Sequence, residues 1–248
     1  MDSGYTSDIL VHFVGWRAPA DNTENYRTLS LVLREGILGR LPHGGGWGDE
    51  ELRIDSSRSL LDGQLVVPRM VCVADIPESA LSIHCAKYGS FGLGFSRTFL
   101  VRYGFRPVMY FPYSSGDHLG AYGRTRLKWI EQAFRDCCEY GAGVVGGAVT
   151  TRTAGAPSST RDEAMQAART AFLRDLLPFL KPFNADLSSA DAENYYLERE
   201  WRRLGNLCFR SSDVVRVYVP EEYVEQARSD HPAYVKQICS CPTAQERL

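Results

Sequence analysis

One segment, residues 70–95 (MVCVADIPESALSIHCAKYGSFGLGF), constrains the fold of this chain most strongly. Strand, helix and glycine-rich patterns follow one another in it without a spacer. The apolar run at 66–73 predicts a mostly buried strand, which Asp75 and Pro77 end. A short helix is predicted from Glu78, because a proline suits the position before a first helical turn. The chain must therefore place a strand, a helix and a glycine-rich segment next to one another.

The glycine-rich segment supports two interpretations. Gly89, Gly92 and Gly94 alternate with apolar residues that include Phe91 and Phe95. Glycines at this spacing allow a loop whose backbone comes close to a ligand, with aromatic rings as flat apolar surfaces beside it. Alternatively, the segment is a tight connection from helix to strand whose aromatic side chains belong to the core.

Periodicity elsewhere predicts a single α+β domain over residues 1–248. The predicted mixed, partly antiparallel sheet contains strands near residues 9, 68, 108, 198 and 216, with helices on at least one face. Helices are expected at 21–36, 123–140, 160–177 and 220–227, with an edge strand at 234–238. The helical part over 123–183 is predicted to be an insertion within the domain.

Two further runs are rich in glycine. The run at 43–48 predicts a surface loop. GAGVVG at 141–146 follows a helix and so lacks the context of a dinucleotide-binding motif.

Bulk properties exclude several classes of protein. The net charge of −2 gives no general attraction for nucleic acid, although Arg124, Arg126 and Lys128 form a local basic cluster. No apolar run reaches the roughly 20 residues that span a bilayer, so no membrane interaction is predicted. The N-terminus lacks the features of a signal peptide, and we expect a cytoplasmic protein.

The seven cysteines are an odd number and lack the paired C-x-x-C spacing of a zinc site. We therefore expect no metal and mostly reduced thiols in the core. Only Cys239 and Cys241, separated by one serine, have the spacing of a redox pair, and they can equally be an incidental feature of the C-terminal region.

Candidate functional residues lie at two places in the chain. His12 falls in the predicted strand at 9–14, where a single carbonyl contact would be enough to keep it neutral. The segment 193–204 (ENYYLEREWRRL) contains two carboxylates, Glu198 and Glu200. In a strand they would lie side by side about 7 Å apart. In a helix they would point about 200° apart, and the charges would form a solvated face.

The order of several short motifs resembles that of the bacterial abortive-infection AbiGi antitoxin family. These motifs are HF in the first strand, LREGIL, CVADIP followed by His84 and YGSFGLGF, PVMY, EREWR and VVRVYVP. The resemblance extends over roughly residues 8–112 and 193–222. It implies a role in phage defence or in a toxin–antitoxin pair, with a cognate toxin or a phage-derived protein as partner.

A more distant likeness is to NAD-using ADP-ribosyltransferases, including the DarT-type toxins that modify DNA. It implies an ADP-ribosyltransferase-like sheet, NAD as a substrate and a protein or nucleic-acid acceptor. By this likeness His12 would hold the nicotinamide ribose, and Tyr88 or Phe91 would stack on nicotinamide. Glu200 would bind the ribose 2′-hydroxyl, with Glu198 as its companion. A carboxylate beside the ribose stabilises the positive charge that develops on the sugar as the glycosidic bond breaks.

Two functions are therefore expected as alternatives. The first is a defence protein with an NAD site that includes Gly92 and Gly94 as the closely approaching backbone. The second is a non-catalytic antitoxin that neutralises a toxin by binding it or its target. The feature that separates them is whether Glu198 and Glu200 lie in a strand that faces His12.

Overall fold

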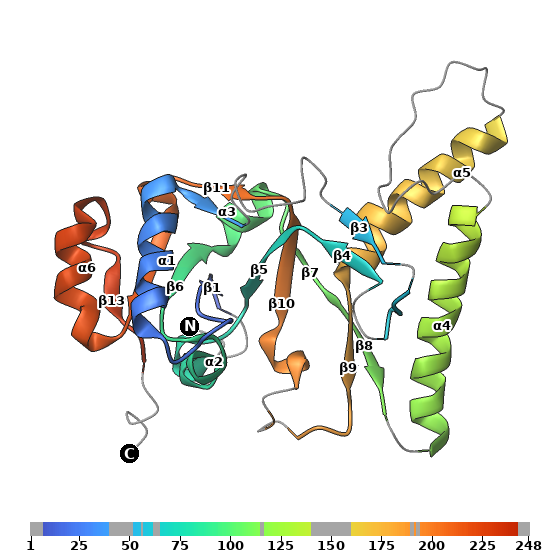
Figure 1. Cartoon of the computed structure of the whole chain (residues 1–248), viewed down its shortest axis with the longest axis horizontal. Coiled ribbons are helices and arrows are strands. Elements are labelled where there is room, and N and C mark those ends of the chain that lie inside the picture. Colours follow the sequence, from blue (N-terminus) through green and yellow to red (C-terminus); the bar gives the residue numbers. More distant parts are fainter. Residues whose placement is uncertain are drawn as a thin grey trace. The chain divides into compact units, whose positions relative to one another are not determined.

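The computed structural model describes residues 7–39, 52–55, 57–61, 65–114, 117–139, 160–188, 191 and 194–242 (Figure 1). Both glycine-rich runs, at 43–48 and 141–146, lie outside these residues. The chain forms two compact units. The first, called the sheet unit, comprises residues 1–41, 71–107 and 198–248, and the second, the helical unit, comprises 42–70 and 108–197. The helices predicted over 123–183 fall within the helical unit.

A seven-stranded mixed sheet organises the sheet unit, which confirms the prediction of a mixed sheet but not its number of strands. Its order is β13-β12-β6-β1-β5-β10-β7, with bounds β1 Ile9–Phe13, β5 Met70–Ala74, β6 Gly92–Ser96, β7 Arg106–Pro107, β10 Glu200–Leu204, β12 Val214–Val219 and β13 Ile238–Ser240. Antiparallel pairs join β1 to β5 and β6, β6 to β12, and β7 to β10. The edge strand β13 runs parallel to β12. It begins at residue 238, so the edge strand predicted at 234–238 is wrong for most of its length, because Pro232–Tyr234 forms a 3₁₀ turn.

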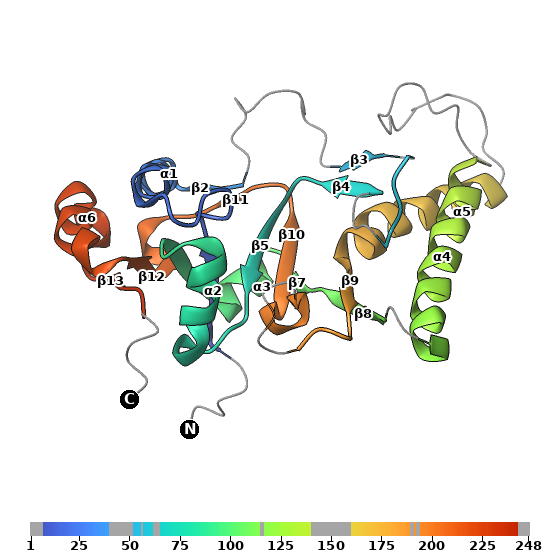
Figure 2. The same ribbon diagram turned by 60° about the horizontal axis from the view of Figure 1, so that its bottom comes forward.

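Helices cover both faces of this sheet (Figure 2). Alternate residues of β1 point to opposite faces. Leu10 packs in one core with Leu29 of α1 (Asn22–Glu35), whereas Val11 packs in a second core with Leu81 of α2 (Leu81–Tyr88). The remaining elements are α3 Arg97–Arg102, α6 Val224–Asp230, the 3₁₀ turns Glu78–Ala80, Ser211–Asp213 and Glu221–Tyr223, and the pair β2 Ile37–Leu38 with β11 Leu207–Cys208.

Helix α1 confirms the helix predicted at 21–36. The Asp21 carboxylate accepts a hydrogen bond from the backbone N–H of Glu24 at 3.0 Å, which satisfies one of the donors left over in the first turn. Gly36 ends the helix in the left-handed conformation, with φ of 65°. Local chemistry therefore decides where this helix starts and stops.

The prediction of a glycine-rich loop at 89–95 is wrong for most of its length. Gly92–Ser96 forms β6, a strand near the middle of the sheet, between β1 and β12. Phe91 and Phe95 are fully buried, so the alternative interpretation, with the aromatic side chains in the core, is confirmed. The glycines serve packing, because a Cβ at Gly94 would lie 2.7 Å from Ile9 Cγ2 and 3.1 Å from Arg216 Cβ.

We therefore predict that Gly94→Val destabilises the fold. The added side chain has no space between β1 and β12, and overpacking of this kind costs about 1–3 kcal/mol. Gly94→Ala should cost less, because a single methyl group requires a smaller displacement of Ile9 and Arg216 than the branched side chain of valine. Thermal melting of both variants tests this. Wild-type melting of Gly94→Val combined with lost function would instead support a ligand-binding role for this backbone.

The helical unit contains the two long helices and two small pairs of strands. Helix α4 runs from Asp117 to Glu139, and α5 (Thr160–Thr170) continues through a π-helical turn, Ala171–Leu176, into the 3₁₀ turn Leu177–Phe179. Strand β8 (Met109–Tyr113) pairs in parallel with β9 (Leu180–Asn184), and β3 (Leu52–Ile54) pairs with β4 (Val66–Pro68). Phe134, Leu173 and Leu177 are among the buried residues that form its core.

Two segments predicted as single strands are each divided between the two units. Residues 66–73 form β4 and β5 with a break at Arg69, and residues 106–113 form β7 and β8 with a break at Val108. The boundary between the sheet unit and the helical unit falls at residues 70–71 and 107–108. The prediction of one continuous strand is therefore wrong in both places. An apolar run alone does not show that its two halves pair with different partners.

Candidate functional site

Three buried carboxylates mark the candidate site in the sheet unit. Asp75, Glu198 and Glu200 have 3%, 6% and 6% of their surface exposed. Buried carboxylates of this kind require cations or hydrogen-bond donors around them. Here they are partnered by four cations, and we call the whole group of seven the ionic cluster: Asp75, Lys87, Arg97, Glu198, Arg199, Glu200 and Arg202.

Glu198 is the last residue of the 3₁₀ turn Tyr195–Glu198 and contacts helix α2. Its Oε1 accepts a hydrogen bond from Lys87 Nζ at 3.0 Å and a second one from the Tyr88 hydroxyl. The Lys87 ammonium also lies 5.2 Å from the centre of the Tyr88 ring. Adjacent residues at the end of one helix thus bind one carboxylate oxygen.

Glu200 is the first residue of β10 and is engaged by its own strand. Arg202 donates from Nε to Oε1 at 2.7 Å and from Nη2 to Oε2 at 3.2 Å, which makes a bidentate ion pair. The side chain of Arg202 is 14% exposed and that of Glu200 is 7% exposed. The pair is therefore largely removed from water.

Neither of the two predictions for residues 193–204 is correct over the whole segment. A 3₁₀ turn ends at Glu198, a strand begins at Glu200, and Arg199 between them has φ of 44°. A left-handed conformation costs a residue with a side chain roughly 1–2 kcal/mol. Because of this local turn, the two carboxylates do not project from alternate positions of one strand.

Asp75 directly follows β5 and connects the cluster to the rest of the sheet unit. Its carboxylate lies 3.2 Å from Arg97 Nη2 and 3.3 Å from Arg199 Nη2, and it accepts a hydrogen bond from the backbone N–H of Ser7 at 3.0 Å. Its own N–H donates to the carbonyl of Arg199 at 3.4 Å. Asp75 therefore stabilises the unusual conformation of Arg199.

His12 lies in β1 and bonds to β5. Its Nδ1 donates a hydrogen bond to the Cys72 carbonyl at 2.7 Å, which fixes the tautomer because a carbonyl can only accept. Burial lowers the pKa of His12, and the bond to Cys72 opposes that shift. In the sheet β5 lies between β1 and β10, the strand of Glu200. His12 is thus a neutral, half-buried sheet residue.

The remaining predicted residues fall into two groups. Tyr88 lies beside His84 and Phe13, with ring centres 6.4 Å apart in both cases. Burial lowers the pKa of His84, although Glu198 acts in the opposite direction.

Phe91 belongs to the core on the α1 side of the sheet, where it packs against Tyr26 and Tyr223. Of the seven predicted site residues, the structure joins Tyr88 directly to Glu198. It places Phe91, Gly92 and Gly94 within the packed sheet and its core.

Two members of the ionic cluster, Asp75 and Lys87, were not predicted as site residues. Asp75 was noted only as the end of a strand, and Lys87 was not singled out. The charges at 198–203 were a usable signal, because residues two positions apart in a strand share a face and can pair if their charges are opposite. Within the described residues, no group of three His, Cys, Asp or Glu side chains is arranged to bind a metal ion.

The lowered histidine pKa values predict a pH-dependent stability. Burial lowers the pKa of His12, His84 and His231 below the value of about 6.5 expected in the unfolded chain. Below pH 6.5 the unfolded chain therefore binds more protons than the folded protein, and stability is lost as the pH falls. We expect the melting temperature to decrease from pH 7.5 to 5.5, and to decrease less steeply in His12→Gln. A melting temperature that is constant or rises over this range would contradict the burial of these imidazoles.

The fold and the site define a mixed α/β protein with an internally paired ionic cluster. A protein-family model described as "Putative abortive phage resistance protein AbiGi, antitoxin" matches residues 63–234, well over half of the chain. The chain belongs to this AbiGi family. The match includes the helical region that the sequence resemblance left out, and it begins after β1. No curated protein and no solved structure gave a significant match.

The described helices include none that is long and apolar enough to cross a membrane. The family description names an antitoxin of abortive infection, and an antitoxin family implies a cognate toxin as partner.

Proposed function

We propose that this protein neutralises its toxin by binding it stoichiometrically, without turning over a substrate. The observation that carries the proposal is the state of the two carboxylates expected to act on NAD. Glu200 is held by Arg202 through two hydrogen bonds, and Glu198 is held by Lys87 and Tyr88. A carboxylate that is already neutralised by a cation has little capacity to stabilise a second positive charge on a substrate.

The burial of the other expected NAD residues supports the same proposal. Phe91 has no exposed surface on which a nicotinamide ring could stack, and a Cβ at Gly94 would meet neighbouring side chains, which fill the space beside this glycine. The Nδ1 of His12 is occupied by the Cys72 carbonyl. These residues contribute to packing and to the sheet.

The proposed docking surface is the exposed face of α4 that contains Tyr122, Arg126 and Trp129. Spacings of four and three residues place them on one side of the helix. Tyr122 is 56% exposed and Trp129 is 59% exposed. The Arg126 guanidinium lies 4.6 Å from the Tyr122 ring centre and 5.1 Å from the Trp129 ring centre. Trp, Tyr and Arg are the residue types that contribute most binding energy at protein interfaces.

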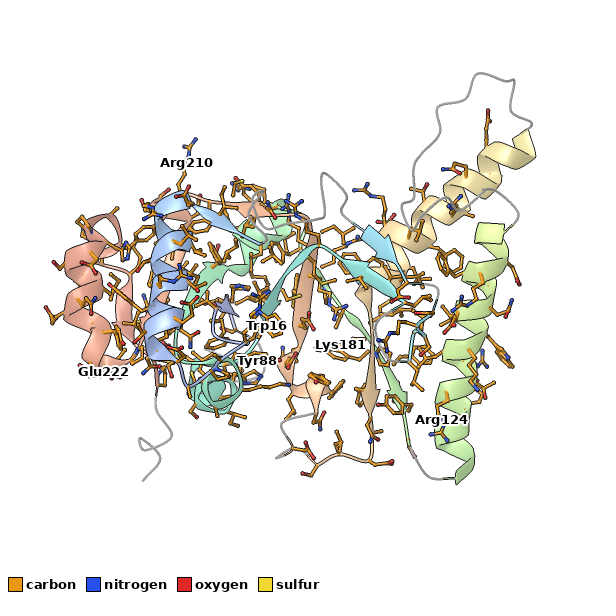
Figure 3. The ribbon with its side chains drawn as sticks, viewed as in Figure 1. Trp16, Tyr88, Arg124, Lys181, Arg210 and Glu222 are labelled. Atoms are coloured by element: carbon orange, nitrogen blue, oxygen red, sulfur yellow. The ribbon has the colours of Figure 1, made fainter. Side chains whose placement is uncertain are left out.

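Arg126 supplies the cation of this face. Arg124, labelled in Figure 3, and Lys128 are each two residues from Arg126 and therefore lie about 200° around the helix, on its opposite side. A partner that presents an acidic group to Arg126 fits this face best, and we assign the cognate toxin to that position. The stacking of Arg126 between two rings restricts the three side chains before binding, which lowers the entropic cost of association.

One arrangement favours the catalytic alternative, an ADP-ribosyltransferase-like NAD site. Tyr88, His84 and Glu198 form a group of aromatic, imidazole and carboxylate side chains, next to a residue with positive φ at Arg199. Strained backbone of this kind is concentrated at functional sites. In this alternative, Tyr88 would stack on nicotinamide and Glu198 would face the ribose.

Isothermal titration of the purified protein with NAD separates the two functions. Our proposal expects no saturable heat and no release of nicotinamide, with or without protein, RNA and DNA acceptors. Saturable NAD binding that is lost in Tyr88→Ala, while folding is retained, would establish the catalytic alternative instead.

A further inference from the structure

Two cysteines far apart in the sequence have their sulfur atoms in contact. Cys85 lies in α2 and Cys241 directly follows β13, 156 residues later, and their Sγ atoms are 2.7 Å apart. Both thiols are free. A disulfide bond is about 2.05 Å long, so the two sulfurs would need to approach by less than about 1 Å. Cys239, which has the spacing of a redox pair with Cys241 in the sequence, directs its thiol to the Val217 carbonyl at 3.8 Å.

The two thiols differ in reactivity. Cys241 is only 2% exposed, whereas Cys85 is half-buried and therefore reachable by a small oxidant. The hydrogen bond with Cys241 lowers the pKa of Cys85, whereas the same bond and burial raise the pKa of Cys241. The thiolate is the form that attacks oxidants, so Cys85 is the reactive residue and Cys241 the thiol that resolves its oxidised form.

We propose that Cys85 and Cys241 form a reversible disulfide when the reduced protein meets a peroxide. The Cys85 thiolate attacks one peroxide oxygen, the O–O bond breaks, and a sulfenic acid and one water result after proton uptake. Cys241 then loses its proton and attacks the Cys85 sulfur, the S–O bond breaks, and a second water leaves. Hydrogen peroxide is reduced to two waters, and the two thiols are oxidised by two electrons.

This bond would join α2 to the C-terminal end of the sheet unit. Helix α2 carries Lys87 and Tyr88, so the bond would fix the helix that contacts Glu198. A cross-link that closes a loop of this length restricts the unfolded chain strongly. We expect the oxidised protein to melt roughly 5–15 °C higher than the reduced protein.

The test is peroxide treatment of the purified full chain, followed by intact mass and peptide mapping under non-reducing conditions. The expected product has lost two hydrogen atoms, contains a peptide linking Cys85 to Cys241, melts at the higher temperature and reverts with dithiothreitol. Cys85→Ser and Cys241→Ser should each abolish the linked peptide. Cys208→Ser, at an exposed position, and Cys239→Ser should retain it.

Three results would overturn the proposal: a bridge between Cys239 and Cys241, higher oxidation of Cys85 without any bridge, or no oxidation of Cys85 at all. Melting of each serine variant in its reduced form shows whether it folds. If Cys241→Ser does not fold, Cys241→Ala replaces it, because alanine places no hydroxyl in this apolar core.

Discussion

Replacing Glu200 with glutamine is expected to lower the melting temperature by about 10 °C. The substitution keeps the shape of the side chain but removes the negative charge from the bidentate ion pair with Arg202, which is only 14% exposed. Removing one partner of a buried ion pair costs about 3–5 kcal/mol, and each kcal/mol corresponds to about 2–4 °C in a domain of this size. Thermal melting followed by circular dichroism measures the change.

Glu225→Gln is the matched control for this experiment. Glu225 also pairs with an arginine, Arg228, at 2.8 Å, but its side chain is 86% exposed. Exposed pairs contribute little because water screens them, so this variant should melt close to the wild-type temperature. The opposite pattern for Glu200→Gln, with normal melting and a loss of NAD turnover by a factor of about 10² to 10³, would indicate a catalytic carboxylate.

Replacing Trp129 with alanine is expected to weaken toxin binding by about 30-fold or more without affecting folding. The indole is 59% exposed and stacks on Arg126, so its removal takes away the largest contact surface on α4 and frees the guanidinium. Central aromatic residues of interfaces cost at least about 2 kcal/mol when truncated, and 1.4 kcal/mol is tenfold in affinity. Calorimetric titration of the cognate toxin into the variant measures the loss.

Trp16→Ala is the control for a nonspecific effect of removing an exposed tryptophan. Trp16 is 64% exposed, lies in the sheet unit, and has the Arg17 guanidinium 5.3 Å from its ring centre. It resembles Trp129 in chemistry and differs in position. Equal losses for the two variants, or no loss for Trp129→Ala, would show that α4 is not the docking surface. Loss of nucleic-acid binding in Trp129→Ala would assign the face to that class of partner.

The parts of the fold that depend on local chemistry could be predicted from the sequence. Helix α1 has an acidic cap at Asp21 and a glycine at its C-terminus, and both act within a few residues. Strands β1 and β12 have clear apolar patterns, and their positions were predicted within one residue. These signals need no knowledge of the rest of the chain.

The parts that depend on distant contacts could not be predicted. Strand β6 is built around two glycines and became a strand because β1 and β12 pair with it on both sides. Strand β9 contains Pro182 and falls mostly within the part predicted to be helical, 123–183, although it pairs in parallel with β8. In both cases tertiary pairing outweighs the local preference of the residues.

The candidate site was predicted in part for the same reason. Tyr88 and Glu198 were both selected, but their hydrogen bond joins residues 110 positions apart. Whether Glu198 faces water or Lys87 depends on how the 3₁₀ turn Tyr195–Glu198 packs against α2. The sequence of either segment alone does not determine this packing. Charged residues at 198–203 look like a solvated face until the fold buries them.

The most direct test of the account is a titration of toxin activity with purified protein, in the presence and absence of NAD. Neutralisation by binding predicts that toxin activity falls linearly and reaches its minimum near equimolar protein, and that NAD does not change the curve. Full neutralisation by a small fraction of an equivalent, and only when NAD is present, would contradict the account and establish a catalytic antitoxin.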